Sequence, residues 1–443
     1  MQLSAPSHPR ASRLALAAAL LLASPLAAQK APPPPQVDDA TATAIANAAL
    51  EAAPVFDGHN DAPGQLRQRY DNQINAFDFT DTMDEHDHVG GDDGAMHTDL
   101  LRLKKGKVGA QFWSVYVPHN ANEAAAVQQT IEQIDVTKRL IARNPDTMRY
   151  ALTADQVETA MREGKVASLL GMEGGYSIGS SLAVLRQFHA MGARYMTLTH
   201  NSNIPWADAA TDNPKHGGLT AFGMDVVREM NRLGMLVDLS HVSEDTMMDA
   251  LDVAKAPVIF SHSGARAVTP HPRNVPDSVL ARLPENGGVV MVVALPRFID
   301  EDIRQWDAKR AGELARLKVV HLGNPDAATK AMDAWLAANP EPKASIKDVA
   351  DHIMHIREVA GIEHIGIGGD YDGMPIGPVG MEDVSGYPAL FTELARRGLS
   401  QAELELIASR NILRVMRAAE AYAASVAGEP PIETLITPPA KAE

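Results

Sequence analysis

The stretch Val55-Phe56-Asp57-Gly58-His59-Asn60-Asp61 places two apolar residues ahead of a short turn that carries a histidine and an aspartate. Residues two apart on an extended strand point to the same face, so His59 and Asp61 are placed to share one metal ion. A single pair of this kind is more often a surface hydrogen bond. The pair becomes a stronger indication of a metal site because further histidines and carboxylates recur at the ends of other predicted strands.

Eight short apolar runs rich in β-branched residues alternate with longer amphipathic stretches. The runs are residues 54–57, 108–116, 166–171, 195–199, 236–240, 258–261, 289–295 and 365–368. The amphipathic stretches include residues 123–143, 182–191, 222–233 and 244–254. Strands that alternate with helices form parallel βαβ units, and eight such units fit a closed (β/α)8 barrel. We therefore predict an α/β fold, a TIM barrel in a single domain with inserted loops and a helical C-terminus.

The first 28 residues have the pattern of an export signal. Arg10 and Arg13 precede a short apolar run, and small residues follow up to Ala28. The run is too short to span a bilayer, and no later stretch of the sequence is long and apolar enough. We expect cleavage after Ala28 and an exported protein, periplasmic or secreted, without a membrane span.

The composition narrows the classes of function. The formal net charge is −16 and no basic stripe is present, so we expect no binding to nucleic acid. The chain has no cysteine. This excludes disulfides and thiolate ligands, so histidine and carboxylate must hold any metal.

The chain divides into four predicted segments. These are a signal peptide at 1–28, a linker at 29–44, the barrel domain at 45–425 and a Pro-rich tail at 426–443. An Ala-rich stretch at 39–52 predicts a first helix.

Two insertions interrupt the barrel pattern. The acidic stretch 78–99 also carries histidines and glycines, and we favour a solvated loop over a cation site. The charged stretch 301–342 contains helical runs at 303–319 and 326–336, and we expect it to decorate the barrel.

Ionisable residues follow six of the predicted strands. They are His59, Asp61, Glu173, His200, His241, His262 and Asp370. The active site of such a barrel lies where its strands end. Ionisable groups crowded in one layer are costly unless a metal neutralises them. The ligand types favour zinc, with manganese or cobalt also suitable, and their number favours two ions bridged by a carboxylate.

Eleven short motifs occur in one order along residues 45–420. They are DGHND (57–61), QFWSVY (111–116), EGKVAS (163–168), EGG (173–175), LTH (198–200), PWAD (205–208), DLSHVS (238–243), FSHS (260–263), RNVPD (273–277), GDYDG (369–373) and NILRV (411–415). In this ordered set the chain resembles the membrane (renal-type) dipeptidases. The resemblance implies a metallopeptidase with an amidohydrolase-type barrel and a binuclear zinc site. It also implies a homodimer, since members of the family often form dimers.

The resemblance assigns a metal role to five residues. His59 and Asp61 would hold one zinc ion, His241 and His262 would hold the other, and Glu173 would bridge the two.

Three further residues match groups that handle the substrate. His200 matches the residue that contacts the substrate and steadies the tetrahedral intermediate. Arg273 matches the group that binds the terminal carboxylate, and Asp370 matches the acid/base. The hypothesis is therefore hydrolysis of dipeptides, in which two zinc ions give a bridging hydroxide and Asp370 transfers the proton.

The chain departs from the family pattern in two places near these residues. Ala62 and Gly64 stand where the family commonly has leucine and tryptophan, and Tyr176 stands where it commonly has histidine. Neither change touches a predicted metal ligand, and both are expected to reshape the pocket wall.

Two alternative functions stay open. The same barrel serves other metal-dependent amide hydrolases, including lactam and deaminase chemistry. A non-catalytic periplasmic protein that binds peptides or metal is the alternative from another class.

Three other histidines are expected to lie at the surface. His271 has no predicted role. His352 and His355, three residues apart on a predicted helix, are expected to face solvent.

Overall fold

The computed structural model describes residues 1–2, 37–83, 95–119 and 122–436. All of the expected export signal beyond residue 2 lies outside these residues, as do part of the acidic stretch, 84–94, and the end of the tail, 437–443. The described residues from 37 onward form one compact unit. Among the described residues, no helix combines the length and apolarity that crossing a membrane requires.

The described chain contains nine strands that pair in parallel in one sheet. They are β1 (Val55–Asn60), β2 (Val108–Ser114), β3 (Met148–Tyr150), β4 (Val166–Glu173), β5 (Ala193–Thr197), β6 (Leu236–Asp238), β7 (Ile259–Ser263), β8 (Val289–Val292) and β9 (Ile365–Ile367). The order is β2-β1-β9-β8-β7-β6-β5-β4-β3, and β2 also pairs with β4. This pairing closes eight strands into a barrel, while short β3 lies beside the first half of β4. The predicted (β/α)8 barrel is confirmed.

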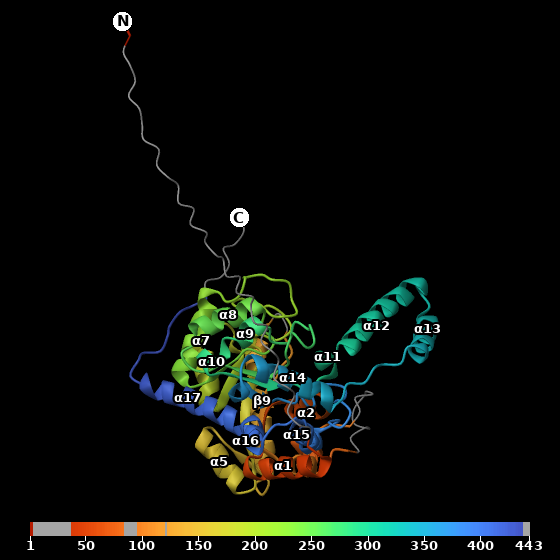
Figure 1. Ribbon diagram of the computed structural model, residues 1–443, viewed down its shortest axis with the longest axis horizontal. Coiled ribbons are helices and arrows are strands. Elements are labelled where there is room, and N and C mark those ends of the chain that lie inside the picture. The colour runs from red at the N-terminus through yellow and green to blue at the C-terminus, as the bar shows by residue number, and fades with distance from the viewer. Residues whose placement is uncertain (3–36, 84–94, 120–121, 437–443) are drawn as a thin grey trace. The chain divides into compact units, whose positions relative to one another are not determined.

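Helices surround the barrel (Figure 1). They are α1 (Asp39–Ala52), α2 (Ala62–Tyr70), α3 (Leu100–Lys105), α4 (Glu123–Arg143), α5 (Ala154–Arg162), α6 (Leu182–Met191), α7 (Ala221–Leu233), α8 (Glu244–Val253), α9 (Asp277–Leu280), α10 (Leu283–Asn286), α11 (Pro296–Ile299), α12 (Glu301–Val320), α13 (Pro325–Ala338), α14 (Ile346–Val359), α15 (Tyr387–Arg396), α16 (Gln401–Glu405) and α17 (Asn411–Ser425). Helix α1 begins inside the stretch 29–44 that the sequence assigns to a linker. A π-helical turn at Leu406–Arg410 joins α16 to α17.

Sequence signals at the helix ends explain the bounds. Ser181 accepts a hydrogen bond from the backbone N–H of Val184 and begins α6. Gly192, with φ at 111°, ends the same helix in the left-handed conformation that glycine adopts at low cost. Thr220 and Gly234 begin and end α7 in the same way. These caps fix where the chain turns back toward the next strand.

Apolar side chains fill the lower layer of the barrel. Phe56 on β1 stacks on Phe112 on β2, with ring centroids 5.3 Å apart, and Phe112 meets the ring of Tyr195 on β5 at 4.9 Å. All three are fully buried, as is Met291 on β8. We call these four residues the floor of the barrel. Each fully buried side chain of this size contributes about 1.5–3 kcal/mol to folding.

Strand β1 changes register just above the floor. Its pairing with β2 is irregular between Asp57 and Asn60. Gly58 lies so close to the neighbouring strands that a Cβ there would sit 2.5 Å from the sulfur of Met291. A bulge of this kind re-aims the next side chain. Here it accompanies His59, whose ring reaches Tyr195 inside the barrel.

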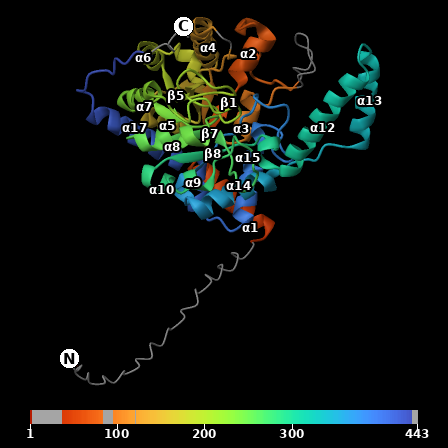
Figure 2. The ribbon, with the colours of Figure 1, turned by 90° about the horizontal axis from the view of Figure 1, so that it is seen from above.

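The insertion after β8 forms a helical hairpin. The long helix α12 and its partner α13 project together from the barrel (Figures 1 and 2). Between them they bury few apolar side chains, of which α12 supplies Ile303 and Leu317. The hairpin extends from the short helix α11, which contributes Phe298 to the cavity described below.

The position of His352 on α14 differs from the prediction. His352 was expected to face solvent, but it is fully buried. Its Nδ1 accepts a hydrogen bond from the backbone N–H of Ala265 at 2.7 Å. His352 lies on the buried face of α14 with Ile353 and Ile356, and the i, i+3 spacing of two histidines does not tell which face of a helix they occupy. His355 is partly exposed, with Nε2 2.8 Å from the carboxylate of Asp277.

Candidate active site

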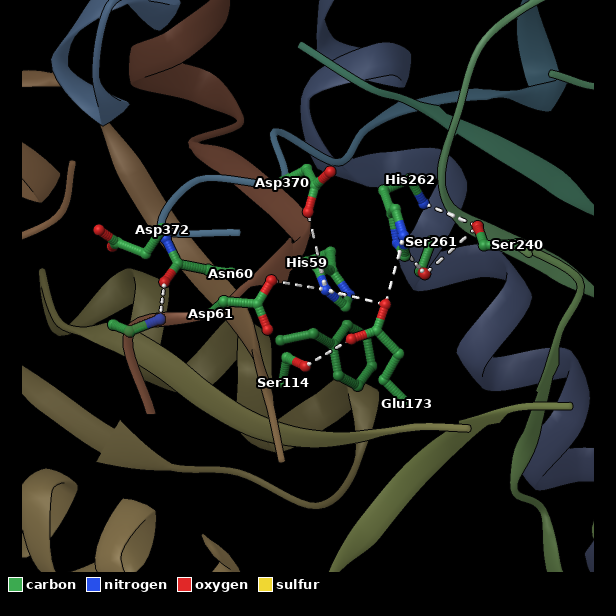
Figure 3. Close-up of polar contacts among 12 residues, drawn as sticks. His59, Asn60, Asp61, Ser114, Glu173, Ser240, Ser261, His262, Asp370 and Asp372 are labelled. Carbon is green, nitrogen blue, oxygen red and sulfur yellow. Dashed lines mark hydrogen bonds and ion pairs between the residues drawn. The ribbon is translucent and has the colours of Figure 1, made fainter. Parts of the chain in front are cut away.

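Glu173, the last residue of β4, is the centre of the cluster at the strand ends. Its Oε1 is 3.0 Å from the Nε2 of His241 and 3.5 Å from that of His262. The Nε2 of His59 lies 3.6 Å away and that of His200 3.8 Å away. Figure 3 shows Glu173 reaching toward His59 and His262. Four imidazoles from four strands or the loops after them therefore meet at one carboxylate oxygen.

Two aspartates complete the cluster on the side of His59. Asp61 Oδ2 is 3.1 Å from His59 Nε2, and Asp370 Oδ1 is 4.0 Å from the same nitrogen. Asp61 directly follows β1, and Asp370 lies on the loop after β9. The structure thus brings together every strand-end residue that the sequence singled out. We call these seven residues the mouth cluster.

Buried partners orient two of the imidazoles. Ser261 Oγ donates to Asp238 Oδ2 at 2.6 Å and lies 2.8 Å from His262 Nδ1. Because the serine proton goes to Asp238, the serine oxygen accepts the Nδ1 proton of His262. His59 Nδ1 lies 2.8 Å from the hydroxyl of Tyr195. Nδ1 is thereby occupied in both rings and Nε2 is left facing the cluster, as in metal sites with a supporting outer shell.

Asp57 ties two strand ends together. Its Oδ1 accepts the backbone N–H of His59 and that of Gly369, both at 3.0 Å. The hydroxyl of Tyr387 donates to its other oxygen. The carboxylate therefore fixes His59 relative to the loop that carries Asp370.

Sequence reasoning missed both Asp57 and Asp238. A signal was present, because an aspartate precedes a predicted ligand by two residues at Asp57 and by three at Asp238. Only the fold reveals that these carboxylates turn away from the cluster and bind backbone and hydroxyl groups.

The backbone is strained where the cluster is built. His241, Asp370 and Asp372 have φ values of 70°, 62° and 64°, in the left-handed region that favours glycine. Each such residue costs about 1–3 kcal/mol, and such costs concentrate at functional sites.

Burial sets the electrostatics of the cluster. It raises the pKa of Glu173 to about 8 and that of Asp370 to about 7. Burial also opposes a charge on His59, but the neighbouring charges of Glu173 and Asp61 raise its pKa to about 10. The pKa of His262 is held well below its ordinary value, first by burial and then by the charge of His59. The charges of the protein groups alone thus compensate one another poorly. A bound cation would stabilise the charged carboxylates and leave the imidazoles neutral.

The cluster opens into a cavity of about 920 Å³. Arg273 lies in its wall, only 1 % exposed. Its Nη2 donates to the carbonyl oxygen of His262 at 3.4 Å, and its guanidinium lies over the ring of Phe298, 5.2 Å from the centroid. No described residue accepts a hydrogen bond from its Nε or Nη1. Burial lowers the Arg273 pKa to about 10, so the side chain remains a cation with free donors at neutral pH.

His271 is partly buried and lines the same cavity, so it does not lie on the outer surface as expected. Its Nδ1 accepts the backbone N–H of Arg273 at 3.2 Å, and its ring packs on Phe298 with centroids 4.3 Å apart. Burial and the charge of Arg273 lower the pKa of His271 to about 4. A loop position gave no periodicity from which this burial could be read.

The two departures from the family pattern differ in position. Gly64 lies in the cavity wall. The fully buried Tyr176 is not part of the cavity lining that the described residues form, and its hydroxyl donates to the carbonyl oxygen of Val117. Of the two departures, only the one at Gly64 changes the cavity lining.

The sequence and the fold both have relatives among known proteins. An uncharacterized dipeptidase of Schizosaccharomyces pombe is 42 % identical over 395 residues, which cover 86 % of this chain and 84 % of the relative. The dipeptidase tcpJ of Claviceps purpurea is 41 % identical over 385 residues, covering 85 % and 79 %.

Solved structures share the fold at lower sequence identity. The probable dipeptidase PvdM from Pseudomonas aeruginosa superposes with a TM-score of 0.71 at 23 % identity, covering 86 % of this chain and 99 % of that one. A metallo peptidase from Rhodobacter sphaeroides, liganded with a phosphinate mimic of the dipeptide L-Ala-D-Ala, has a TM-score of 0.64 at 24 % identity, covering 83 % and 99 %.

A family model extends over most of the chain. The model for membrane dipeptidase, peptidase family M19, matches residues 43–429. This range contains the mouth cluster and every strand of the barrel. The chain belongs to the membrane dipeptidase family, M19.

Proposed function

We propose that the protein is a zinc-dependent dipeptidase with two metal ions per chain. The observation that carries the proposal is the meeting of four imidazole Nε2 atoms at Glu173 Oε1, beside a cavity that holds the buried guanidinium of Arg273. The Nε and Nη1 atoms of Arg273 have no hydrogen-bond partner among the described residues. The first feature suits a pair of divalent ions, and the second suits a free carboxylate.

The donor set fits such a metal pair. His59 and Asp61 would hold one ion, His241 and His262 would hold the other, and Glu173 would be shared. Two supports favour this use: the ordered second nitrogens of His59 and His262, and the absence of cysteine from the chain. When bound, the ions would supply Lewis acidity toward the scissile carbonyl and lower the pKa of a water molecule.

The protein groups have distinct tasks in this proposal. Arg273 binds the substrate carboxylate through its planar fork and thereby limits the substrate to a short peptide. His200 is neutral, because burial and the charge of Arg273 lower its pKa to about 3, and it donates a hydrogen bond to the developing oxyanion. Asp370 takes up the proton of the attacking water and delivers it to the leaving amine. In the metal-free protein, burial raises the pKa of Asp370 above its ordinary value.

A comparison of three substrate types tests this function directly. The zinc-loaded protein is expected to hydrolyse dipeptides with a free C-terminus and to leave C-terminally amidated dipeptides and a cyclic amide almost untouched. Preferred turnover of the cyclic amide would assign the barrel to a different hydrolase chemistry. Binding of dipeptides without turnover would favour a peptide-binding protein.

Variants at Arg273 separate recognition of the carboxylate from structural support. Arg273→Ala should raise KM for free dipeptides by about 100-fold, the scale of losing a charge-assisted hydrogen bond, and Arg273→Lys should restore part of the loss. Slow residual turnover of amidated dipeptides should be unchanged in both variants. An equal loss on free and amidated substrates would make Arg273 structural.

We also propose that the protein is exported by its first 28 residues. The pattern of Arg10 and Arg13, an apolar run and small residues up to Ala28 supports this. N-terminal sequencing of the mature protein from its natural host should then begin at Gln29. A mature protein that starts at Met1 would contradict export by this route.

A further inference from the structure

Gly64 is a helical residue in the wall of the cavity. It lies in the first turn of α2, and its backbone N–H donates to the carbonyl oxygen of Asp61 at 2.7 Å. Glycine is a poor helix former compared with alanine, so its presence in a helix calls for a reason.

Neither the backbone nor the packing requires glycine at this position. Gly64 is not among the described glycines with positive φ. Among the described residues, the nearest atom to a Cβ added at Gly64 would be the Cβ of Asp61, at 4.0 Å. The direction in which a side chain would grow is therefore open space.

A second glycine of the cavity wall shows the opposite case. A Cβ added at Gly373 would lie 2.3 Å from Oδ2 of Asp61 and 2.7 Å from Oδ1 of Asp370. Gly373 is thus needed for close approach to the mouth cluster. Gly64 has no such need, and what its missing side chain provides is room in the cavity.

The position of Gly64 indicates which part of a substrate would use this room. Gln65, its neighbour on α2, donates to the carbonyl oxygen of Asp372 at 2.7 Å, so the first turn of α2 lies against the loop that follows Asp370. Arg273 lies elsewhere in the wall, against the carbonyl oxygen of His262. With its carboxylate on Arg273 and its scissile carbonyl beside Glu173, a dipeptide would direct its amino-terminal residue toward Asp61 and Gly64, which line the same cavity.

We propose that Gly64 opens a subsite for a large apolar side chain on the amino-terminal residue of the substrate. This assignment rests on the proposed dipeptidase function. The loop held by Gln65 continues into Met374 and Pro375, which also line the cavity and supply apolar surface beside the polar side chains of Gln68 and Arg69. The cavity of about 920 Å³ lies near the top of the range of about 300–1,000 Å³ usual for ligand sites, so it has room beyond a pair of small residues.

The variant Gly64→Trp tests the subsite with three dipeptides and the zinc-loaded full chain. The kcat/KM for Phe-Ala should fall by about 10- to 100-fold, because the new ring fills the space of the substrate side chain. The kcat/KM for Ala-Ala and for Ala-Phe should change by less than about threefold, as expected where the pocket contacts are unaltered. The comparison of Phe-Ala with Ala-Ala measures the lost space. The comparison of Phe-Ala with Ala-Phe shows that this space belongs to the amino-terminal residue.

Gly312→Trp is the matched control. Gly312 lies on the exposed hairpin helix α12, and no described atom lies within 4 Å of a Cβ added there. This control variant should keep the wild-type kcat/KM for all three dipeptides.

Each other outcome contradicts a defined part of the proposal. An equal fall of Gly64→Trp on all three dipeptides, or no change on any, would overturn the subsite. A loss confined to Ala-Phe would place the space beside the other residue of the substrate. If the wild-type protein hydrolyses none of the three, the dipeptidase function itself fails and the subsite assignment fails with it.

Discussion

The mouth cluster and the floor of the barrel are built on the same strands but use burial in opposite ways. On β1, Phe56 packs into the floor, and three residues further His59 enters the mouth cluster. Floor side chains gain free energy by leaving water. Mouth side chains lose hydration that only hydrogen bonds, neighbouring charges or a bound cation can offset. The comparison teaches that stability and chemistry are separated along each strand, so changes at the two ends should have separable effects.

The largest effect is expected where the mouth cluster loses its shared carboxylate. Glu173→Gln should lower kcat/KM for dipeptides by about 1,000-fold or more, since metal chemistry contributes several kcal/mol to catalysis. Its fold should persist, because the amide keeps the shape of the side chain and Asp61 still lies 3.1 Å from His59. Enzyme kinetics and thermal unfolding of one preparation measure both effects. Glu163→Gln, at an exposed surface ion pair, is the control.

The floor should respond in the reverse manner. Phe112→Ala should lower the free energy of unfolding by about 3–5 kcal/mol, because it leaves a cavity beneath the mouth cluster. The variant molecules that remain folded should keep most of their kcat. Denaturant unfolding and active-site-normalised kinetics measure the two quantities, with Ile131→Ala on the exposed face of α4 as the control. Loss of all activity without loss of stability would show that the two ends are not separable.

His352 tests whether a buried histidine outside the mouth cluster acts only through stability. Burial lowers its pKa from 6.5 to about 4 in the folded state, so the unfolded chain binds more protons between these pH values. Stability should therefore fall as pH drops through this window, by about 3 kcal/mol for one group. In His352→Gln this component should vanish from the curve of the free energy of unfolding against pH. In His355→Gln, at the partly exposed neighbour, it should persist.

The smallest effect is expected at the boundary between the two regions. Ser261→Ala removes the hydroxyl between Asp238 and His262. Loss of such an outer-shell partner typically costs about 10- to 100-fold in metal affinity. Competitive chelator titration should detect it, while the unfolding midpoint of the metal-free protein changes little. Unchanged metal affinity would mean that packing alone orients His262.

The architecture was largely predictable from local signals. Alternating strands and helices, with caps such as Ser181 and Gly192, specify βαβ units that close in few ways. The seven mouth residues were also predictable, because strand ends meet at one face of a barrel.

The residues that hold the mouth cluster in place were less predictable. Asp57 and Asp238 bind partners up to hundreds of positions away, such as Gly369 and Tyr387 for Asp57, and no local period encodes such contacts. The burial of His352 and the place of His271 in the cavity wall were missed for the same reason, since both depend on which elements pack around them. The open space at Gly64 is a property of the assembled cavity alone.

Metal stoichiometry of the chelated and re-loaded protein tests the central claim most directly. Zinc is added stepwise to the metal-free chain, and bound metal and dipeptide hydrolysis are measured on the same samples. The two-metal proposal predicts saturation at about two zinc ions per chain, with full hydrolysis only near the second equivalent, and saturation below two in Glu173→Gln. Hydrolysis by the metal-free chain, or full activity at one equivalent with no second ion bound, would contradict it.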